Sequence, residues 1–173
     1  RSWAHPLLVL YAAENGTAVT TATATDVDAA TTLTYSISGG ADAAKFAINS
    51  STGVLTFVSA PDFEVPTDVG GNNVYDVTVQ VSDGAFTDTQ GIAVTVTNVN
   101  ESPVITSDGG GTTASVSAAE NQTAATTVAS TDVDGGAPSY SIVGGADAAL
   151  FTINASTGAL TFLAAPDFEA PAD

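Results

Sequence analysis

The feature that most constrains the fold of this chain is an internal repeat. Four short motifs of the first half return in the second half in the same order. They are Ala-Glu-Asn at 13–15 and 119–121, Asp-Val-Asp at 26–28 and 132–134, Tyr-Ser-Ile at 35–37 and 140–142, and Ala-Pro-Asp-Phe-Glu at 60–64 and 165–169. The spacing of 105 or 106 residues exceeds that of solenoid repeats and matches a whole small domain. The 173 residues are therefore predicted to form a tandem array of domains, with a boundary near residues 100–111.

Within the first copy, apolar residues alternate with polar ones, which is the period of half-buried β-strands. The alternation is clearest at Tyr75, Val77, Val79, Val81, Ile92, Val94 and Val96. Turn signals between such runs predict seven strands, at residues 7–13, 17–25, 32–38, 45–48, 54–58, 74–82 and 86–97. Seven short antiparallel strands predict an all-β fold, a two-sheet Greek-key sandwich of immunoglobulin-like type. The Cys-Trp-Cys core of true immunoglobulin domains is absent from the sequence.

The second copy is predicted to be incomplete. Asp173 aligns with Asp68, so counterparts of the last two predicted strands do not follow. We divide the chain into a leader at 1–6, a first repeat at 7–106 and a second repeat at 107–173 that lacks these two strands. Such a repeat would leave an apolar face and open strand edges. Either the chain is truncated or another chain completes the repeat.

Acidic residues dominate the charge. The sequence has 19 Asp and Glu residues but only two basic residues, Arg1 and Lys45, which gives a formal net charge of −17. Nucleic acid and anionic membrane surfaces are therefore poor partners. The sequence has no Cys, which excludes disulfides and thiolate chemistry, and its apolar runs are far shorter than the roughly 20 residues that span a bilayer. With 44% apolar residues, the chain is not a disordered acidic tail.

The predicted topology gathers acids at the two ends of each sandwich. The end where the first strand begins, the leading end, receives Asp26, Asp28 and Asp83. The opposite, trailing end receives Glu14, Asp62 and Glu64. The linker and the leading end of the second copy add Asn100, Glu101, Asp132 and Asp134 to that place. At least six carboxylates are thus expected at the junction between the repeats.

These carboxylates need a cation, because the chain has almost no Lys or Arg to neutralise them. Carboxylates, Asn side chains and backbone carbonyls, without His or Cys, favour Ca²⁺ over Zn²⁺. Mg²⁺ prefers to keep its waters. The sequence therefore predicts Ca²⁺ at the junction.

The same residues carry a resemblance to a known family. Ala-Glu-Asn, Asp-x-Asp, Asp-x-Glu, Ser-Asp-Gly at 82–84 and an Asn-containing linker that ends at Pro103 follow one another in this order. This order resembles the cadherin repeat, particularly the cadherin-like repeats of large bacterial surface proteins. The resemblance covers residues 7–107 fully and 112–173 partly. It implies Ca²⁺ ions between successive repeats, which stiffen the junction in an extracellular or cell-surface protein.

The resemblance also implies three sets of calcium ligands. Those of the junction in this chain are Glu14, Asp62, Glu64, Asn100, Glu101, Asp132 and Asp134. Half of a preceding junction is implied at Asp26, Asp28 and Asp83, and half of a following one at Glu120, Asp167 and Glu169. The family linker Asp-x-Asn-Asp-Asn reads Asn-Val-Asn-Glu-Ser at 98–102, with a neutral Asn in place of the first Asp and the longer carboxylate of Glu in place of the second. This departure implies fewer or more weakly bound ions.

Other acids are interpreted without a ligand role. Asp42, Asp68, Asp108 and Asp147 have no acidic partners in the predicted topology and are expected to be solvated or turn residues. No His lies inside a repeat, and the chain has no Gly-x-Ser-x-Gly motif and no Gly-rich phosphate loop. The sequence therefore predicts that the chain is not an enzyme.

Two functions remain open at this point. The first is a module of a long secreted or cell-surface array, in which Ca²⁺ stiffens the junctions for cell adhesion. Its partners would be neighbouring repeats, other copies of the protein or a cell-surface ligand. The second is a structural subunit of an extracellular filament, which polymerises because strands of a neighbouring chain complete the second repeat.

Overall fold

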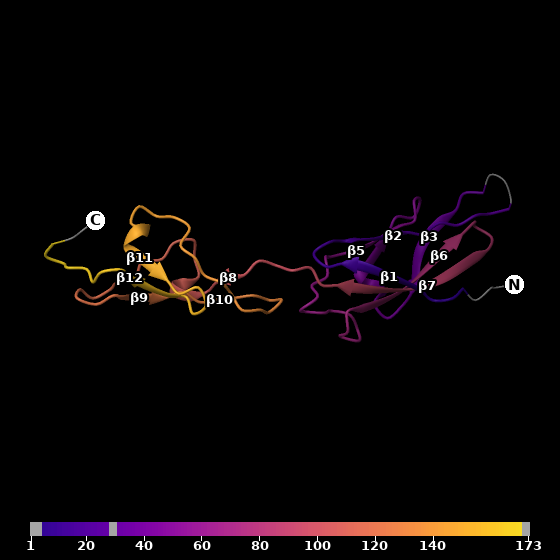
Figure 1. Cartoon of the computed structure of the whole chain (residues 1–173). Helices are drawn as coiled ribbons and strands as arrows, with labels where there is room; N and C mark the ends of the chain where they lie inside the picture. The colour runs from indigo at the N-terminus through magenta and orange to yellow at the C-terminus, as the bar shows by residue number, and fades with distance from the viewer. Residues whose placement is uncertain (1–4, 28–30, 171–173) are drawn as a thin grey trace. The chain divides into compact units, whose positions relative to one another are not determined.

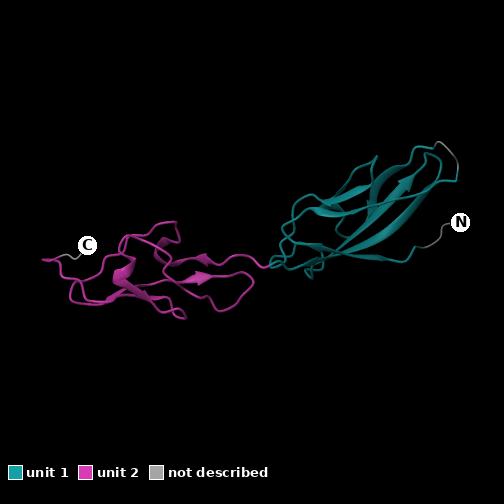
Figure 2. Ribbon diagram, turned by 45° about the horizontal axis from the view of Figure 1, so that its top comes forward, with its two compact units in different colours: residues 1–99 teal, residues 100–173 magenta. Residues whose placement is uncertain are grey.

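The computed structural model describes residues 5–27 and 31–170 (Figure 1). These residues form β-strands and three short 3₁₀ turns, which confirms the predicted all-β class. The chain divides into two compact units, Arg1–Val99 and Asn100–Asp173 (Figure 2). Among the described residues, no helix has the length and apolar character needed to cross a membrane.

Unit 1 contains a four-stranded sheet in the order β1-β7-β6-β3. Its strands are β1 (Leu8–Ala13), β3 (Thr34–Gly39), β6 (Val74–Ser82) and β7 (Thr87–Thr97). β6 pairs antiparallel with both β3 and β7, but β1 pairs parallel with β7. The expectation of antiparallel strands throughout was therefore wrong at β1. Parallel neighbours need a long connection, and nearly the whole unit separates β1 from β7 along the chain.

The second sheet of unit 1 has the order β2-β5-β4 and is antiparallel. Its strands are β2 (Ala18–Thr21), β4 (Phe46–Ile48), which follows the 3₁₀ turn η1 (Ala43–Lys45), and β5 (Val54–Phe57). All seven predicted strands are present. The largest difference is in β2, which was expected to extend to residue 25. β2 ends at Thr21 because its partner there is Val54, the first residue of β5.

The core of unit 1 lies between its two sheets. The alternation predicted for β6 and β7 is confirmed, since Tyr75, Val77, Ile92, Val94 and Val96 are each at most 2% exposed. The second sheet contributes Leu55, Phe46 and Phe57 to the same core. Burial of one such side chain stabilises the fold by roughly 1.5–3 kcal/mol, so each of these residues contributes substantially to the stability of unit 1.

Unit 2 repeats part of this architecture. Its three-stranded sheet has the order β11-β12-β9, formed by β9 (Ala124–Thr127), β11 (Phe151–Ile153) after the 3₁₀ turn η3 (Ala148–Leu150), and β12 (Ala159–Phe162). Phe151 pairs with Phe162 as Phe46 pairs with Phe57 in unit 1. A two-stranded sheet pairs β8 (Val104–Ile105) with β10 (Ser130–Thr131), and the 3₁₀ turn η2 (Ser107–Gly109) follows β8. No apolar side chain between residues 100 and 170 is fully buried.

Candidate metal centre

A group of three carboxylates lies at the trailing end of unit 1. Glu14 follows β1, and Asp62 and Glu64 lie in the connection from β5 to β6. Each residue offers one oxygen, and the three oxygens lie within 4.8 Å of one another. The structure thus brings together the three acids that the sequence analysis placed at this end of the repeat.

Glu14 is the fixed member of this group. Its side chain is only 4% exposed. One carboxylate oxygen accepts the N–H of Phe63 at 2.6 Å, and the other accepts the N–H of Val99 at 2.7 Å. The Glu14 N–H donates to the carbonyl of Thr97, which continues the pairing of β1 with β7. Glu14 therefore ties the β5–β6 connection to the end of β7 and holds its charge in one position.

Asp62 and Glu64 are more accessible than Glu14. Asp62 is exposed and accepts the N–H of Val65 at 2.9 Å, which closes a tight turn. Glu64 is half-buried and accepts the side-chain amide of Asn98 at 2.6 Å. An ionised carboxylate has about four acceptor positions, so the bond from Val65 leaves lone pairs of Asp62 for another ligand. The group combines one buried, oriented carboxylate, Glu14, with an exposed one, Asp62, and a half-buried one, Glu64.

Unit 2 contains the same arrangement. Glu120, Asp167 and Glu169 also lie with their oxygens within 4.8 Å of one another. Glu120 accepts the N–H of Phe168 at 3.2 Å, and Asp167 accepts the N–H of Glu169 at 3.0 Å. All three acids are exposed, which differs from the burial of Glu14. The repeat in the sequence is therefore also a repeat of carboxylate geometry.

A turn with left-handed backbone places the glutamate in both units. Asn15 and Asn121 have φ values of 62° and 60°, a region that Asn tolerates better than most residues. Their N–H groups donate to the carbonyls of Pro61 and Pro166 at 3.0 and 2.9 Å. In each unit, this bond holds the Asn that follows the glutamate against the loop that carries the other two acids of the group.

Four further predicted ligands form a hydrogen-bonded set at the start of unit 2. The N–H of Glu101 donates to the carboxylate of Asp134 at 2.5 Å, and the N–H of Asp134 donates to Asp132 at 3.1 Å. The side-chain amide of Asn100 donates to the carbonyl of Glu101 at 2.8 Å. The linker and the Asp-Val-Asp motif are thus in direct contact within this unit.

Two of the three predicted ligands at the leading end of unit 1, Asp26 and Asp83, accept hydrogen bonds from nearby residues. Asp83 accepts the N–H groups of Phe86 and Ala85 at 2.6 and 2.7 Å, and these two donors lower the pKa of its carboxyl. Asp26 accepts the hydroxyl of Thr31 at 2.9 Å. Asp28 lies outside the described residues. Within residues 5–27 and 31–170, neither Asp26 nor Asp83 belongs to a group of three acids like those above.

Two acids of unit 1 have a structural role that the sequence analysis missed. Asp42 and Asp68 were expected to be solvated or turn residues, but they are only 3% and 7% exposed. The Asp42 carboxylate accepts the N–H of Val69 at 2.7 Å and that of Asp76 at 2.9 Å. Asp42 therefore joins the start of β6 to the connection before it. The return of Gly-Gly-Ala-Asp in both repeats was the available signal for a structural role of Asp42.

Asp68 stabilises the same connection. It accepts the N–H groups of Asn72 and Asn73, both at 3.0 Å. Burial raises the pKa of Asp68, but the backbone donors at Asn72 and Asn73 outweigh burial, so its pKa lies below the ordinary value. Together Asp42 and Asp68 hold the connection on which Asp62 and Glu64 are placed.

The donor set fits a hard divalent cation. All the donors in both groups of three are carboxylate oxygens. Two ligands on opposite sides of one Ca²⁺ ion lie about 5 Å apart, because each Ca–O bond is about 2.3–2.6 Å. A mutual separation of at most 4.8 Å is compatible with a single ion. The groups also lack the sulfur and nitrogen donors that favour Zn²⁺.

Sequence comparisons relate the chain to one family. A family model of the cadherin domain matches residues 10–100. Human protocadherin Fat 4 is 36% identical over 165 residues, which cover 89% of this chain and 3% of that protein. Human protocadherin Fat 1 is 33% identical over 140 residues, with coverages of 77% and 3%. The chain thus spans a very small part of these relatives, and their mammalian origin gives no support to the expected similarity to bacterial surface proteins in particular.

Comparisons with solved structures support the fold. A crystal structure of Drosophila N-cadherin EC1-4 aligns with a TM-score of 0.62 and 17% identity, covering 94% of this chain and 40% of that one. Human protocadherin-24 EC1-2, form II, aligns with a TM-score of 0.56 and 22% identity, covering 95% and 78%. These alignments confirm the predicted immunoglobulin-like sandwich.

Proposed function

The chain belongs to the cadherin family, an extracellular adhesion-type family, and from this premise we propose that it is a calcium-binding module whose junctions are stiffened by Ca²⁺. The observation that carries the proposal is the recurrence of one carboxylate geometry. Glu14, Asp62 and Glu64 in unit 1 correspond to Glu120, Asp167 and Glu169 in unit 2. A single acidic turn is common in proteins. Two equivalent groups of three acids indicate that both groups serve the same purpose, which we propose is Ca²⁺ binding.

We propose that the junction ligands come from both sides of the linker. Unit 1 contributes Glu14, Asp62 and Glu64, and the start of unit 2 contributes Asn100, Glu101, Asp132 and Asp134. The chain order supports this assignment, because β7 ends at Thr97 and the second unit begins at Asn100. The family pattern described for the sequence supports it as well.

The remaining predicted ligands are proposed to serve other junctions. Asp26, Asp28 and Asp83 would contribute to a site with a preceding repeat, and Glu120, Asp167 and Glu169 to a site with a following one. Each set is only part of the six to eight oxygen ligands that Ca²⁺ takes. Their affinity for Ca²⁺ in this chain alone is therefore expected to be lower than that of the complete junction.

Ca²⁺ is proposed to act as both a stabiliser and a stiffener. Without it, the carboxylates repel one another, and the net charge of −17 increases that repulsion. Extracellular calcium modules bind at roughly 0.1–1 mM, so the calcium concentration outside the cell would saturate a useful fraction of the sites. At 100 times the dissociation constant, one site adds about 2.7 kcal/mol to the free energy of unfolding.

We propose that the chain acts as a binding module within an extracellular array of such repeats. The proposed partners are neighbouring repeats, other copies of the protein and a cell-surface ligand. The alternative of a polymerising filament subunit gains no support from the relatives named above, which are cadherin-type proteins. We therefore favour the repeat module over the filament subunit.

The proposal is tested by a calcium titration of the whole chain. We expect saturable heat of binding in calorimetry, together with a rise in Tm between chelator and millimolar Ca²⁺. Asp62→Asn combined with Glu64→Gln should weaken both effects. The matched control is Asp76→Asn combined with Asp147→Asn, which removes two exposed charges outside the acid groups. Equal titration curves for the wild type and the double variant would contradict the proposal.

A further inference from the structure

Asn73 contacts the loop that carries two of the acids of unit 1. It is the residue before β6, which begins at Val74. Its side-chain amide donates to the carbonyl oxygen of Phe63 at 2.8 Å. Phe63 stands between Asp62 and Glu64 in the chain. The bond therefore lies at the centre of the segment that carries these two acids.

Both polar backbone groups of Phe63 are held by side chains. The N–H of Phe63 donates to the carboxylate of Glu14 at 2.6 Å, and its carbonyl accepts the amide of Asn73. The Phe63 side chain is partly buried and packs against the core of unit 1. Glu14 supplies one of the two backbone contacts and Asn73 supplies the other, so the path of the loop depends on both residues.

Asn73 is itself anchored by its backbone. Its N–H donates to the carboxylate of Asp68 at 3.0 Å, and its carbonyl accepts the N–H of Val96 at 2.8 Å. Both of these partners are buried. The amide of Asn73 thus extends toward the loop from a position that a buried carboxylate and β7 hold in place.

Two features of Asn73 are unfavourable by themselves. Its φ value is 61°, in the left-handed region. Its side-chain oxygen is buried, and within the described part of the chain no donor bonds to this atom. Buried polar atoms without a partner are uncommon and call for an explanation. The bond to Phe63 supplies one, because only the nitrogen of the amide can donate to a carbonyl, and the oxygen then faces the other way.

We infer that Asn73 is a positioning residue for the acid group of unit 1, which consists of Glu14, Asp62 and Glu64. Its amide holds the loop so that one oxygen of each acid stays within 4.8 Å of the others. This inference rests on the proposed function, because the arrangement matters only where the group binds Ca²⁺. Without the amide, the loop must be ordered when the ion binds, which lowers the affinity.

Three variants of the whole chain test this role. Asn73→Gly removes the amide and keeps a residue that adopts positive φ readily. Asn73→Ala removes the same amide without the flexibility of glycine, so a loss shared by both variants belongs to the amide. Asn72→Ala is the matched control. The side-chain oxygen of Asn72 accepts the N–H of Val74 at 3.1 Å, in the same turn but away from Phe63.

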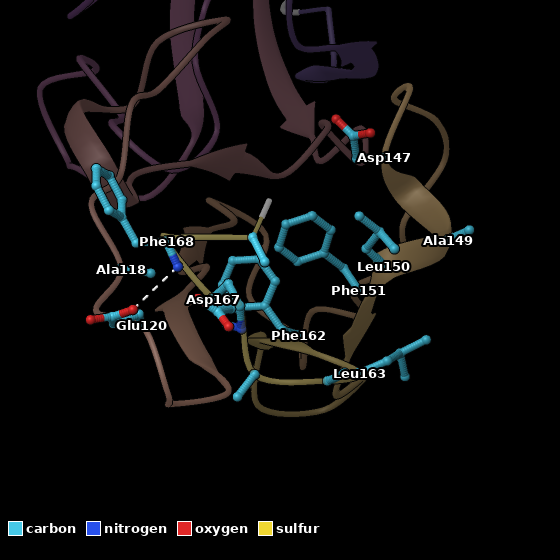
Figure 3. Close-up of a pocket in the computed structure, with 14 residues that line it drawn as sticks. Ala118, Glu120, Asp147, Ala149, Leu150, Phe151, Phe162, Leu163, Asp167 and Phe168 are labelled. Carbon is cyan, nitrogen blue, oxygen red and sulfur yellow. Dashed lines mark hydrogen bonds between the residues drawn. The ribbon is translucent and has the colours of Figure 1, made fainter. Parts of the chain in front are cut away.

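Two backbone amides report the affinity of the two acid groups for Ca²⁺ in NMR titrations. The Phe63 N–H donates to Glu14 and reports on unit 1. The Phe168 N–H donates to Glu120 at 3.2 Å, the bond drawn as a dashed line in Figure 3, and reports on unit 2. Each variant thus carries an internal reference in the unit that was not changed.

We expect both Asn73 variants to raise the Kd at Phe63 about tenfold, as is typical when a contact that orients a metal ligand is lost. Asn72→Ala should leave this Kd unchanged, and Phe168 should give the wild-type Kd in all three variants. A metal-free measurement complements the titration. In chelator, hydrogen exchange of the Phe63 amide should be faster in both Asn73 variants, because its bond to Glu14 opens more often.

The outcomes separate this inference from the proposed function. A lower Tm of both Asn73 variants with an unchanged Kd at Phe63 would show a role in stability alone and would overturn the inference, while the proposed function would stand. Absence of any Ca²⁺-dependent shift of the Phe63 resonance in the wild type would overturn both.

Discussion

The two units of the chain share their strands and turns but differ in the burial of equivalent residues. Phe46 and Phe57 are 5% and 3% exposed in unit 1, whereas Phe151 and Phe162 are half-buried in unit 2. In unit 1 the hairpin of β6 and β7 covers the three-stranded sheet with residues such as Tyr75 and Val94. The comparison teaches that the burial of these phenylalanines depends on the β6–β7 hairpin, whereas their mutual contact does not.

The largest expected effect is on Tyr75, whose removal would make unit 1 resemble unit 2. Tyr75→Ala should lower the free energy of unfolding of unit 1 by about 3–5 kcal/mol, because a large aromatic side chain leaves a cavity in the core. Urea unfolding monitored by circular dichroism measures the change. Tyr11→Ala, at a residue that is 74% exposed, is the control and should shift the free energy by no more than about 0.5 kcal/mol. Equal effects of the two substitutions would contradict the described core.

The next effect concerns Asp42 and its counterpart Asp147. Asp42→Ala should destabilise unit 1 by about 2–4 kcal/mol, because the N–H groups of Val69 and Asp76 lose their acceptor in a buried place. Asp147→Ala should change the stability of unit 2 by no more than about 0.5 kcal/mol, since its side chain is exposed. Urea unfolding of both variants tests this contrast. The predicted contrast would be wrong if the two substitutions lowered the free energy of unfolding by the same amount.

A smaller effect separates the two glutamates of the acid groups. Glu14→Gln should destabilise unit 1 in chelator by about 1–3 kcal/mol, because the amide NH₂ of Gln faces one of the two backbone donors at Phe63 and Val99. Glu120→Gln should leave the stability in chelator within about 0.5 kcal/mol, since Glu120 is exposed. Thermal unfolding in chelator gives both values. Similar losses of Tm would show that Glu14 does not have the anchoring role described here.

The smallest effect is a pH dependence at Asp68. Its pKa in the folded chain lies below the ordinary value, so ionised Asp68 contributes stability above about pH 4, and this contribution is lost as the pH falls through the folded pKa. Asp68→Asn should therefore reduce the acid sensitivity of unit 1. Unfolding midpoints in urea between neutral pH and pH values below the ordinary pKa measure the difference. An unchanged pH profile would indicate that Asp68 has the same pKa in the folded and unfolded chains.

Much of unit 1 could be predicted from its sequence, because its strands alternate in polarity and its turns contain Gly, Asn and Pro. The same alternation identified the buried face of β6 and β7. The parallel pairing of β1 with β7 could not be predicted in this way, since polarity patterns define the faces of a strand but not the direction of its neighbour.

The arrangement of the acidic residues could also be predicted only in part. Glu14, Asp62 and Glu64 could be placed together because the predicted topology puts their loops at one end. The burial of Asp42 and Asp68 could not be predicted from residue type, because an Asp that closes an exposed turn and an Asp that accepts buried backbone N–H groups have the same local sequence preferences. Residue type alone therefore does not distinguish them.

The central claim, that Ca²⁺ stiffens the junction, is tested most directly by single-molecule energy transfer between the two units. The chain has no Cys, so Ala47→Cys and Thr152→Cys, at exposed and equivalent positions of β4 and β11, allow specific labelling. We predict a broad distribution of transfer efficiencies in chelator that narrows in millimolar Ca²⁺ and broadens again when chelator is added. Distributions of the same width in Ca²⁺ and in chelator would contradict the claim.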